Sequence, residues 1–183
     1  NAALLAFKTA KSDGIIQVST GGAKFAAGLG SGDMVRGAIN LADYARAQAD
    51  LYDINVALHT DHCHDDKIDS FLVPLLEESE KRVAAGQQPV FNSHMYDGST
   101  VTLEQNLEMS KKLIARCEKV DIILEVEIGV VGGEEDGHEA EVTNDNLYTT
   151  PQDMIDTHQA LSGLGTYMLA ATFGNVHGVY KPG

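Results

Sequence analysis

Short apolar runs that alternate with amphipathic helical segments constrain this chain to an α/β fold. The strand-like runs lie near residues 15, 55, 89, 121 and 167. Apolar residues recur at helical spacing over 1–11, 33–50, 65–85 and 102–117, and another helix begins at residue 150. Strands separated by helices predict parallel βα units.

Parallel βα units can form an open doubly wound sheet or part of a (β/α)8 TIM barrel. We favour the barrel, because chemically active side chains follow almost every strand and the strand ends of a barrel converge on one mouth. These residues are Ser19, Asp61, His62, Asp97, Glu127 and His177. A complete barrel needs about 250 residues, so residues 1–183 are expected to form one partial barrel domain with about five of the eight units. Strands on both sides of it are expected to be missing.

Composition excludes several classes of partner. The chain carries a formal net charge of −14, which disfavours binding to nucleic acid or to an anionic membrane surface. No run approaches the roughly 20 apolar residues of a membrane helix. The two cysteines, Cys63 and Cys117, are too few for a disulfide framework, so a cytoplasmic protein is expected.

The densest group of metal-binding side chains lies at residues 59–66, which hold three His and three Asp directly after an apolar run. His62 and His177 are the best candidates for metal ligands, because neutral imidazole suits zinc and each follows a predicted strand. The alternative is that each His is simply hydrogen-bonded at the start of a loop. His64 and His94 are expected to lie outside the site.

Carboxylates accompany these histidines. Asp61 can face a substrate while His62 faces a metal, because the alternation of side chains relaxes where a strand ends. Asp97 and Glu127 could supply oxygen ligands to a second cation, or could pair with Lys or Arg. Glu125 shares the strand face of Glu127, so one of the two acids can serve the site while the other supports it.

Glycine-rich segments add two further interpretations. Residues 132–137 place three acids between glycines, which is typical either of a hinged loop that delivers a carboxylate to substrate or of a solvated acidic loop. Residues 19–22 and 175–178 offer backbone N–H groups suited to phosphate. Neither segment matches a P-loop or a dinucleotide fingerprint.

Four segments together resemble the class II, metal-dependent fructose-bisphosphate aldolases. In family order they are HTDHC at 59–63, SHMYD at 93–97, EVEIG followed by GGEEDG at 125–137, and FGNVHGVYKPG at 173–183. The resemblance implies a (β/α)8 barrel, usually a homodimer. It also implies reversible cleavage of fructose 1,6-bisphosphate, a phosphorylated sugar of glycolysis and gluconeogenesis, to dihydroxyacetone phosphate and glyceraldehyde 3-phosphate.

The resemblance also implies a role for each matching residue. His62 and His177 would bind the catalytic Zn²⁺, and Asp97 and Glu127 would match a second divalent cation position. Asp61 would handle the proton of the C4 hydroxyl, and Glu135 the proton at C3. Ser19 and Gly178 would contact a substrate phosphate. The backbone near Val176 and Gly178 could hold a monovalent cation, Na⁺ or K⁺.

The chain departs from the family pattern at its end. The family's third zinc-binding His and its second phosphate site do not occur within residues 1–183, so we expect this stretch alone to be inactive. Two alternatives stay open. One is the related tagatose-bisphosphate aldolase, and the other is a non-catalytic metal-binding fragment.

Overall fold

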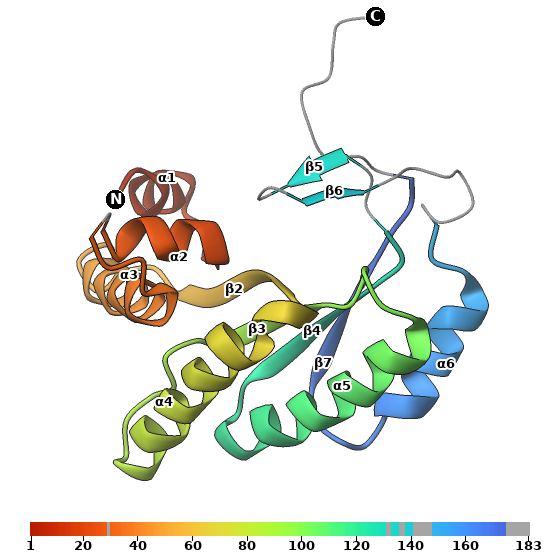
Figure 1. Cartoon of the computed structure of the whole chain (residues 1–183). Helices are drawn as coiled ribbons and strands as arrows, with labels where there is room; N and C mark the ends of the chain where they lie inside the picture. The colour runs from red at the N-terminus through yellow and green to blue at the C-terminus, as the bar shows by residue number, and fades with distance from the viewer. Residues whose placement is uncertain (29, 131–132, 136–137, 141–147, 175–183) are drawn as a thin grey trace, which may run out of the picture.

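The computed structural model describes residues 1–28, 30–130, 133–135, 138–140 and 148–174. Its centre is a five-stranded sheet in the order β1-β2-β3-β4-β7, and every neighbouring pair of strands is parallel (Figure 1). The strands are β1 Gly14–Ser19, β2 Val56–His64, β3 Ser93–Asp97, β4 Ile123–Ile128 and β7 Tyr167–Ala171. The predicted alternation of strands and helices is therefore confirmed.

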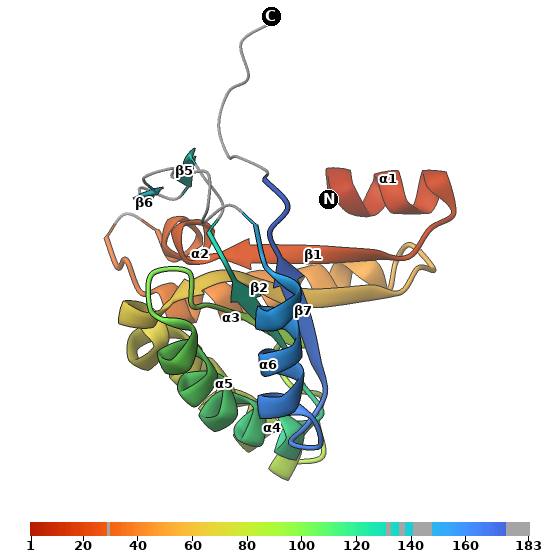
Figure 2. The same ribbon diagram turned by 90° about the vertical axis from the view of Figure 1, so that its right-hand side faces the viewer.

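Helices connect the strands and cover one face of the sheet (Figure 2). Helix α1 Ala2–Ala10 precedes β1, and the connecting helices are α2 Thr20–Ala26, α3 Met34–Ala49, α4 Val73–Ala84, α5 Leu103–Cys117 and α6 Pro151–Leu161. Short 3-10 and π turns add η1 Asp65–Lys67, η2 Ile68–Leu72 and η3 Glu118–Val120. The hydrophobic core lies between the sheet and these helices, and includes the fully buried side chains Leu58, Phe71, Leu75, Phe91, Ile114 and Leu124. None of the described helices is long and apolar enough to cross a membrane.

Capping boxes mark the starts of two helices. Thr102 caps α5 in a capping box with Gln105, and Thr150 caps α6 in the same way with Asp153. Pro151 occupies the first turn of α6, where its missing N–H costs nothing. The predicted helix start at Thr150 is confirmed.

Three segments differ from the sequence prediction. The single helix predicted over 65–85 begins as η1 and η2, and Pro74, which has no N–H to donate to the preceding turn, stands at the start of α4. The segment after Ser19, interpreted as a glycine-rich loop, is α2. The acidic loop carries an antiparallel hairpin, β5 Gly133–Glu135 with β6 His138–Ala140, which lies above the strand ends in Figure 1.

The sheet face away from the helices carries exposed side chains. Ile15 on β1 is 60% exposed and Met168 on β7 is 40% exposed. Among the described residues, β1 and β7 each pair with a single strand of the sheet. Exposed side chains on this face and edge strands paired on one side are expected where a sheet forms part of a barrel wall.

Candidate metal centre

A bulge at the end of β2 decides which side chains face the site. Thr60 is opposite His94 on β3, but Cys63 is already opposite Tyr96, so β2 holds one extra residue there. Thr60 and Cys63 are fully buried, and the two residues between them, Asp61 and His62, both turn away from the core. His62 takes a positive φ of 32° to do so, which costs on the order of 1–2 kcal/mol for an L-residue.

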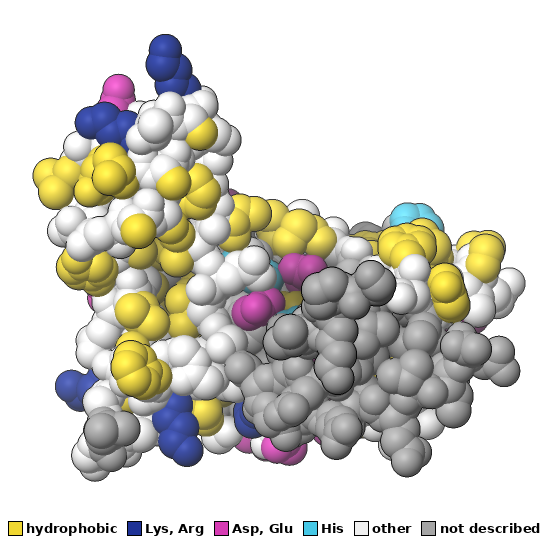
Figure 3. Space-filling view, turned by 90° about the horizontal axis from the view of Figure 1, so that it is seen from above, with side chains coloured by type: hydrophobic (Ala, Val, Ile, Leu, Met, Phe, Trp, Pro, Cys, Tyr) yellow, Lys and Arg dark blue, Asp and Glu magenta, His cyan; other side chains and the backbone are white. Residues whose placement is uncertain are grey.

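The bulge brings His62 to two carboxylates from neighbouring strands. Its Nδ1 lies 3.0 Å from Asp97 Oδ2 and 3.2 Å from Glu127 Oε2. One ligand atom from each of these residues lies within 4.8 Å of the other two, a spacing that suits a bound metal ion. Asp97 and Glu127 are each only 2% exposed, and buried carboxylates require a cation or strong donors. Looking down on the strand ends, Figure 3 shows acidic and histidine side chains in a hollow at the centre of this face.

Hydrogen bonds fix the orientation of Asp97. The backbone N–H of Ser99 donates to Asp97 Oδ1 at 2.9 Å. The other oxygen, Oδ2, faces His62 and also lies 3.1 Å from His64 Nδ1. His64 thus contacts the cluster through Asp97, but it is not one of the three residues whose ligand atoms lie within 4.8 Å of one another.

At neutral pH, His62 carries a positive charge and Asp97 a negative charge. Burial by itself lowers the pKa of His62, but hydrogen bonds to Asp97 and Glu127 outweigh it and raise the pKa to about 11. Burial likewise raises the pKa of Asp97, but donation from His62 and Ser99 lowers it to about 2. A metal ion that binds a ring nitrogen of His62 must displace the proton that gives the imidazole its positive charge.

Asp61 lies on the open side of the cluster. Its Oδ1 accepts a 2.9 Å hydrogen bond from Gln17 Nε2 on β1, and lies 4.0 Å from His62 Nε2. Gln17 thus fixes the direction of the carboxylate without giving it a counter-charge. The sequence offered no signal for Gln17, because its contact crosses from one strand to the next.

A second group of polar contacts lies nearer to the N-terminal ends of β2, β3 and β4 than the cluster does. His59 Nδ1 is 2.7 Å from Ser93 Oγ, and its Nε2 is 3.1 Å from Glu125 Oε2. Of the two acids on one face of β4, Glu127 therefore faces the cluster and Glu125 pairs with His59. These contacts agree with the prediction that one of the two acids serves the site while the other supports it.

Asn106 supports the cluster from the helix side. This residue of α5 is 1% exposed, and its Nδ2 donates to the Glu127 carbonyl oxygen at 2.7 Å. Its Oδ1 accepts from Ser110 Oγ at 3.1 Å. The sequence did contain a signal for Asn106, because it is a polar residue on the apolar face of the predicted helix 102–117.

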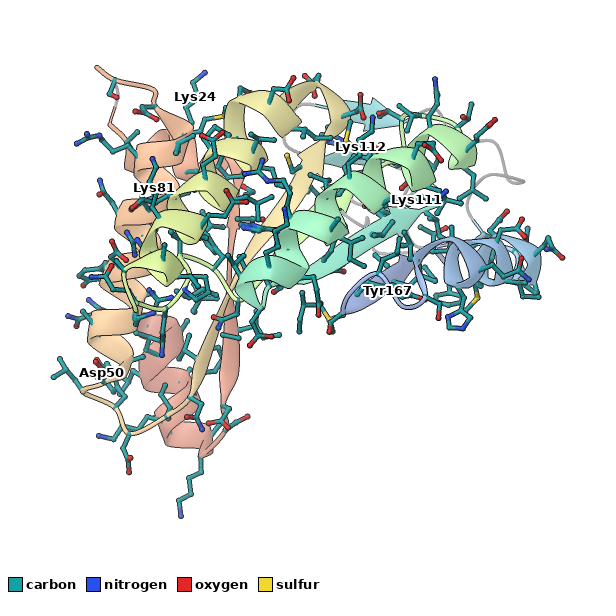
Figure 4. The ribbon with its side chains drawn as sticks, turned by 90° about the horizontal axis from the view of Figure 1, so that it is seen from below. Lys24, Asp50, Lys81, Lys111, Lys112 and Tyr167 are labelled. Atoms are coloured by element: carbon teal, nitrogen blue, oxygen red, sulfur yellow. The ribbon has the colours of Figure 1, made fainter. Side chains whose placement is uncertain are left out.

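Replacing Asn106 by alanine is expected to lower the free energy of unfolding by about 1–3 kcal/mol, because the buried Glu127 carbonyl loses its donor. The measurement is the urea midpoint of the full-length protein. Lys112→Ala is the matched control on the same helix, since Lys112 points outward from α5 (Figure 4), and should change stability by less than about 0.5 kcal/mol. An unchanged midpoint for Asn106→Ala would contradict the role of this hydrogen bond.

His94 lies outside the cluster, as predicted. It is fully buried beside Phe91, and its Nδ1 is 2.8 Å from Thr60 Oγ1. Burial, with a smaller contribution from His59, lowers the pKa of His94 to about 3. The side chain is therefore neutral in the folded protein at neutral pH.

Acid is expected to destabilise the protein through His94. In the unfolded chain this histidine takes up a proton below about pH 6.5, whereas in the fold it does so only near pH 3, so stability falls as pH falls through that window. Between pH 7 and pH 5 this one group should cost about 1–2 kcal/mol. Urea unfolding at both pH values tests it. His94→Asn, which keeps a donor near Nδ1, should show a smaller pH dependence, and an equal dependence would contradict the assignment.

Ser19 ends β1 at the level of Asp61 on β2. Its Oγ accepts a hydrogen bond from Gly22 N at 3.1 Å and so caps α2. Capping uses only an acceptor lone pair, and the hydroxyl proton of Ser19 can still be donated to a ligand. Lys67 Nζ, from η1, lies 3.5 Å from the neighbouring Thr20 Oγ1 and brings a positive charge to this corner.

Comparison with known proteins identifies a protein family for this chain. Residues 1–183, the whole chain, match the sequence family described as Fructose-bisphosphate aldolase class-II. The chain belongs to this family. A fructose-bisphosphate aldolase of Mycobacterium leprae (strain TN) is 58% identical over 185 residues, which cover 100% of this chain and 53% of the relative. The aldolase of Kluyveromyces lactis is 44% identical over 187 residues, which cover 98% of this chain and 52% of the relative.

The crystal structure of fructose-bisphosphate aldolase from Campylobacter jejuni superimposes with a TM-score of 0.84 at 38% sequence identity. The match covers 100% of this chain and 51% of that one. This chain thus spans about half the length of the class II aldolases it matches. Its parallel five-stranded sheet is part of a TIM barrel, as predicted.

Class II aldolases are generally metal-dependent, and the donor set here fits a divalent ion. One imidazole nitrogen and two carboxylate oxygens suit first-row ions such as zinc. His177 and Gly178 lie outside the described residues, as does the side chain of Glu135, whose backbone belongs to β5. The predicted monovalent cation position near Val176 is outside them too.

None of the lysines that Figure 4 labels points toward the cluster. Lys81, Lys111 and Lys112 point away from the sheet on the outer helices (Figure 4). Of the described lysines, Lys67 lies nearest to the strand ends in sequence, and its Nζ is 3.5 Å from Thr20 Oγ1. A class II family member has no need of a lysine that forms a Schiff base, because a metal ion can stabilise the developing negative charge.

Proposed function

We propose that the full-length protein is a metal-dependent aldolase that reversibly cleaves fructose 1,6-bisphosphate to dihydroxyacetone phosphate and glyceraldehyde 3-phosphate. The observation that carries this proposal is the meeting of His62, Asp97 and Glu127 within 4.8 Å at the carboxyl ends of adjacent parallel strands, in a chain of the class II family.

The proposed catalytic ion is Zn²⁺, held by His62 and His177. His62 turns Nδ1 to Asp97 and Glu127, and Nε2 would be the ring nitrogen that binds the ion. Metal-binding histidines commonly donate their other ring N–H to a carboxylate in this way, which fixes the orientation of the ring. When bound, the ion would supply positive charge to the oxygen that becomes negative as the C3–C4 bond breaks.

Two carboxylates are proposed to move the protons. Asp61 would accept the proton of the C4 hydroxyl, since it is partly exposed, lies 4.0 Å from His62 Nε2, and is oriented by Gln17. Glu135 would return a proton at C3 in the cleavage direction and remove it in the reverse direction. A retro-aldol step needs one base and one acid, and two separate carboxylates meet that need.

Phosphate contacts are proposed for Ser19 and Gly178. The net charge of the chain is −14, so an anionic substrate needs local donors rather than a general attraction. The Ser19 hydroxyl and the Lys67 ammonium beside Thr20 supply such donors. Further proposals are a second divalent cation at Asp97 and Glu127, a monovalent cation near Val176 and Gly178, one barrel domain that contains residues 1–183, a homodimer, and a cytoplasmic location.

The test is cleavage of fructose 1,6-bisphosphate by the purified full-length protein, with both triose phosphates identified as products. We expect activity that EDTA abolishes and zinc restores. Tagatose 1,6-bisphosphate, offered at the same concentration, should be cleaved much more slowly. Equal activity in excess EDTA would overturn the metal-dependent aldolase, and a preference for the tagatose sugar would overturn the proposed substrate.

A further inference from the structure

Thr149 joins the carboxyl ends of two neighbouring strands of the sheet. Its Oγ1 donates to the Ile128 carbonyl oxygen, at the end of β4, at 2.8 Å. The same Oγ1 accepts from the N–H of Thr172, directly after β7, at 2.8 Å. The Thr149 N–H in turn donates to the Thr172 carbonyl oxygen at 2.9 Å. One residue thus links β4 to β7 beyond Ile128 and Ala171, the last residues that pair in the ladder.

The Thr149 hydroxyl uses its whole hydrogen-bonding capacity, since a hydroxyl has one proton and two lone pairs. The proton goes to Ile128, one lone pair takes the Thr172 N–H, and Thr172 Oγ1 lies 3.3 Å away, where it can donate to the other. Ile128 and Thr172 are each 2% exposed, so little water reaches these groups. Loss of the hydroxyl would therefore leave a buried carbonyl and a buried N–H without a partner, which is unfavourable.

Gly129 makes this close approach possible. It follows Ile128 with a φ of +91°, a conformation that favours glycine. A Cβ at this position would collide with Thr172 Oγ1 and would stand 3.1 Å from Thr149 Oγ1. The glycine that ends the EVEIG segment therefore serves the contact between the two threonines as well as the turn.

We propose that Thr149 is a positioning residue for aldol cleavage, which acts by fixing the backbone that carries Glu127. Glu127 directly precedes Ile128, and its own carbonyl oxygen accepts from Asn106 Nδ2 at 2.7 Å. Side chains thus hold two successive carbonyl groups at the end of β4, and with this backbone fixed Glu127 Oε2 lies 3.2 Å from His62 Nδ1. The inference rests on the function proposed above, because one of its two readouts is the rate of that reaction.

The first readout is kcat of the zinc-loaded full-length protein, expressed per bound zinc. Thr149→Val keeps the shape of the side chain and loses the hydroxyl, and it should lower kcat about tenfold or more, because a shift of about 1 Å in a supporting group can cost about a hundredfold. KM should change by less than about threefold, since positioning acts on the reacting groups rather than on uniform binding. Thr149→Ser keeps the hydroxyl and should recover at least about half of the wild-type kcat.

Thr157→Val is the matched control. Thr157 is fully buried on α6, and its Oγ1 donates to the Asp153 carbonyl oxygen at 2.7 Å. This variant also loses a hydroxyl that bonds a carbonyl, so its urea midpoint should fall, but its kcat should stay within about twofold of the wild type. Equal losses of kcat in the two valine variants would mean a merely structural role and would overturn the proposal, as would wild-type kcat in Thr149→Val. Should Thr149→Val not fold, Thr149→Ala removes the same hydroxyl without a methyl group against the Ile128 carbonyl, and the same outcomes apply to it.

The second readout, the visible absorption of the Co²⁺-loaded protein, does not depend on activity. It should shift in Thr149→Val and stay unchanged in Thr157→Val, because the carboxylate of Glu127 orients the imidazole of His62. An unchanged spectrum in Thr149→Val would overturn the proposal whatever the rate. Failure of the wild-type protein to cleave fructose 1,6-bisphosphate would instead count against the proposed function.

Discussion

His62→Ala is expected to remove the catalytic zinc and to lower kcat by about a thousandfold or more. The ion supplies several kcal/mol of transition-state stabilisation, and every 1.4 kcal/mol is tenfold in rate. His62 is the residue that Asp97 and Glu127 both approach, and its loss removes one imidazole ligand of the proposed catalytic ion. His177→Ala should lose zinc in the same way. Metal analysis of the purified variants and a coupled assay measure the two effects.

Stability must be followed in the same experiment, because His62 also balances two buried carboxylates. Removing one partner of a buried charge pair costs about 3–5 kcal/mol. His158→Ala is the matched control, because His158 is exposed on α6 and bonds Tyr167, and it should keep both zinc and turnover. A folded His62→Ala protein that bound as many zinc ions per chain as the wild type would contradict the assignment of His62 as a ligand.

Asp61→Ala is expected to lower kcat by about 10²–10⁴-fold while zinc content stays within error of the wild type, because general acid–base catalysis is typically worth that much. Asp61 touches Gln17 and stands 4.0 Å from His62 Nε2, which suits a proton carrier better than a ligand.

The matched variant is Asp61→Asn, which keeps an oxygen for Gln17 to bond and removes only the basic group. It should be as inactive as Asp61→Ala. Full turnover in either variant, or loss of zinc in both, would contradict the proton-transfer role.

Much of the fold could be predicted from sequence, because hydrophobic periodicity and helix-capping residues are local signals. The strand Gly14–Ser19 and the cap at Thr150 both agree with the prediction. The helical nature of Thr20–Ala26 was missed, because Gly21 and Gly22 suggested a loop. In the structure the Ser19 side chain caps that helix and offsets part of the low helix propensity of the glycines.

The candidate site could be predicted only in part, because its contacts cross strands. Asp97 and Glu127 were found because each lies at or next to the end of a strand, and a parallel sheet places them side by side. The position of His64 could not be predicted, since it depends on one extra residue in β2 that reverses the alternation. Gln17 was missed for a similar reason: its partner, Asp61, is 44 residues away in sequence.

Restoring zinc to the metal-free full-length protein tests most directly whether the cluster at the ends of β2, β3 and β4 serves aldol cleavage. Cleavage of fructose 1,6-bisphosphate and bound zinc are followed in the same samples. The cluster predicts no cleavage before zinc is added and a linear rise to a plateau as the His62 position fills, with no rise in His62→Ala. Cleavage at the full rate by protein that holds no metal would contradict it.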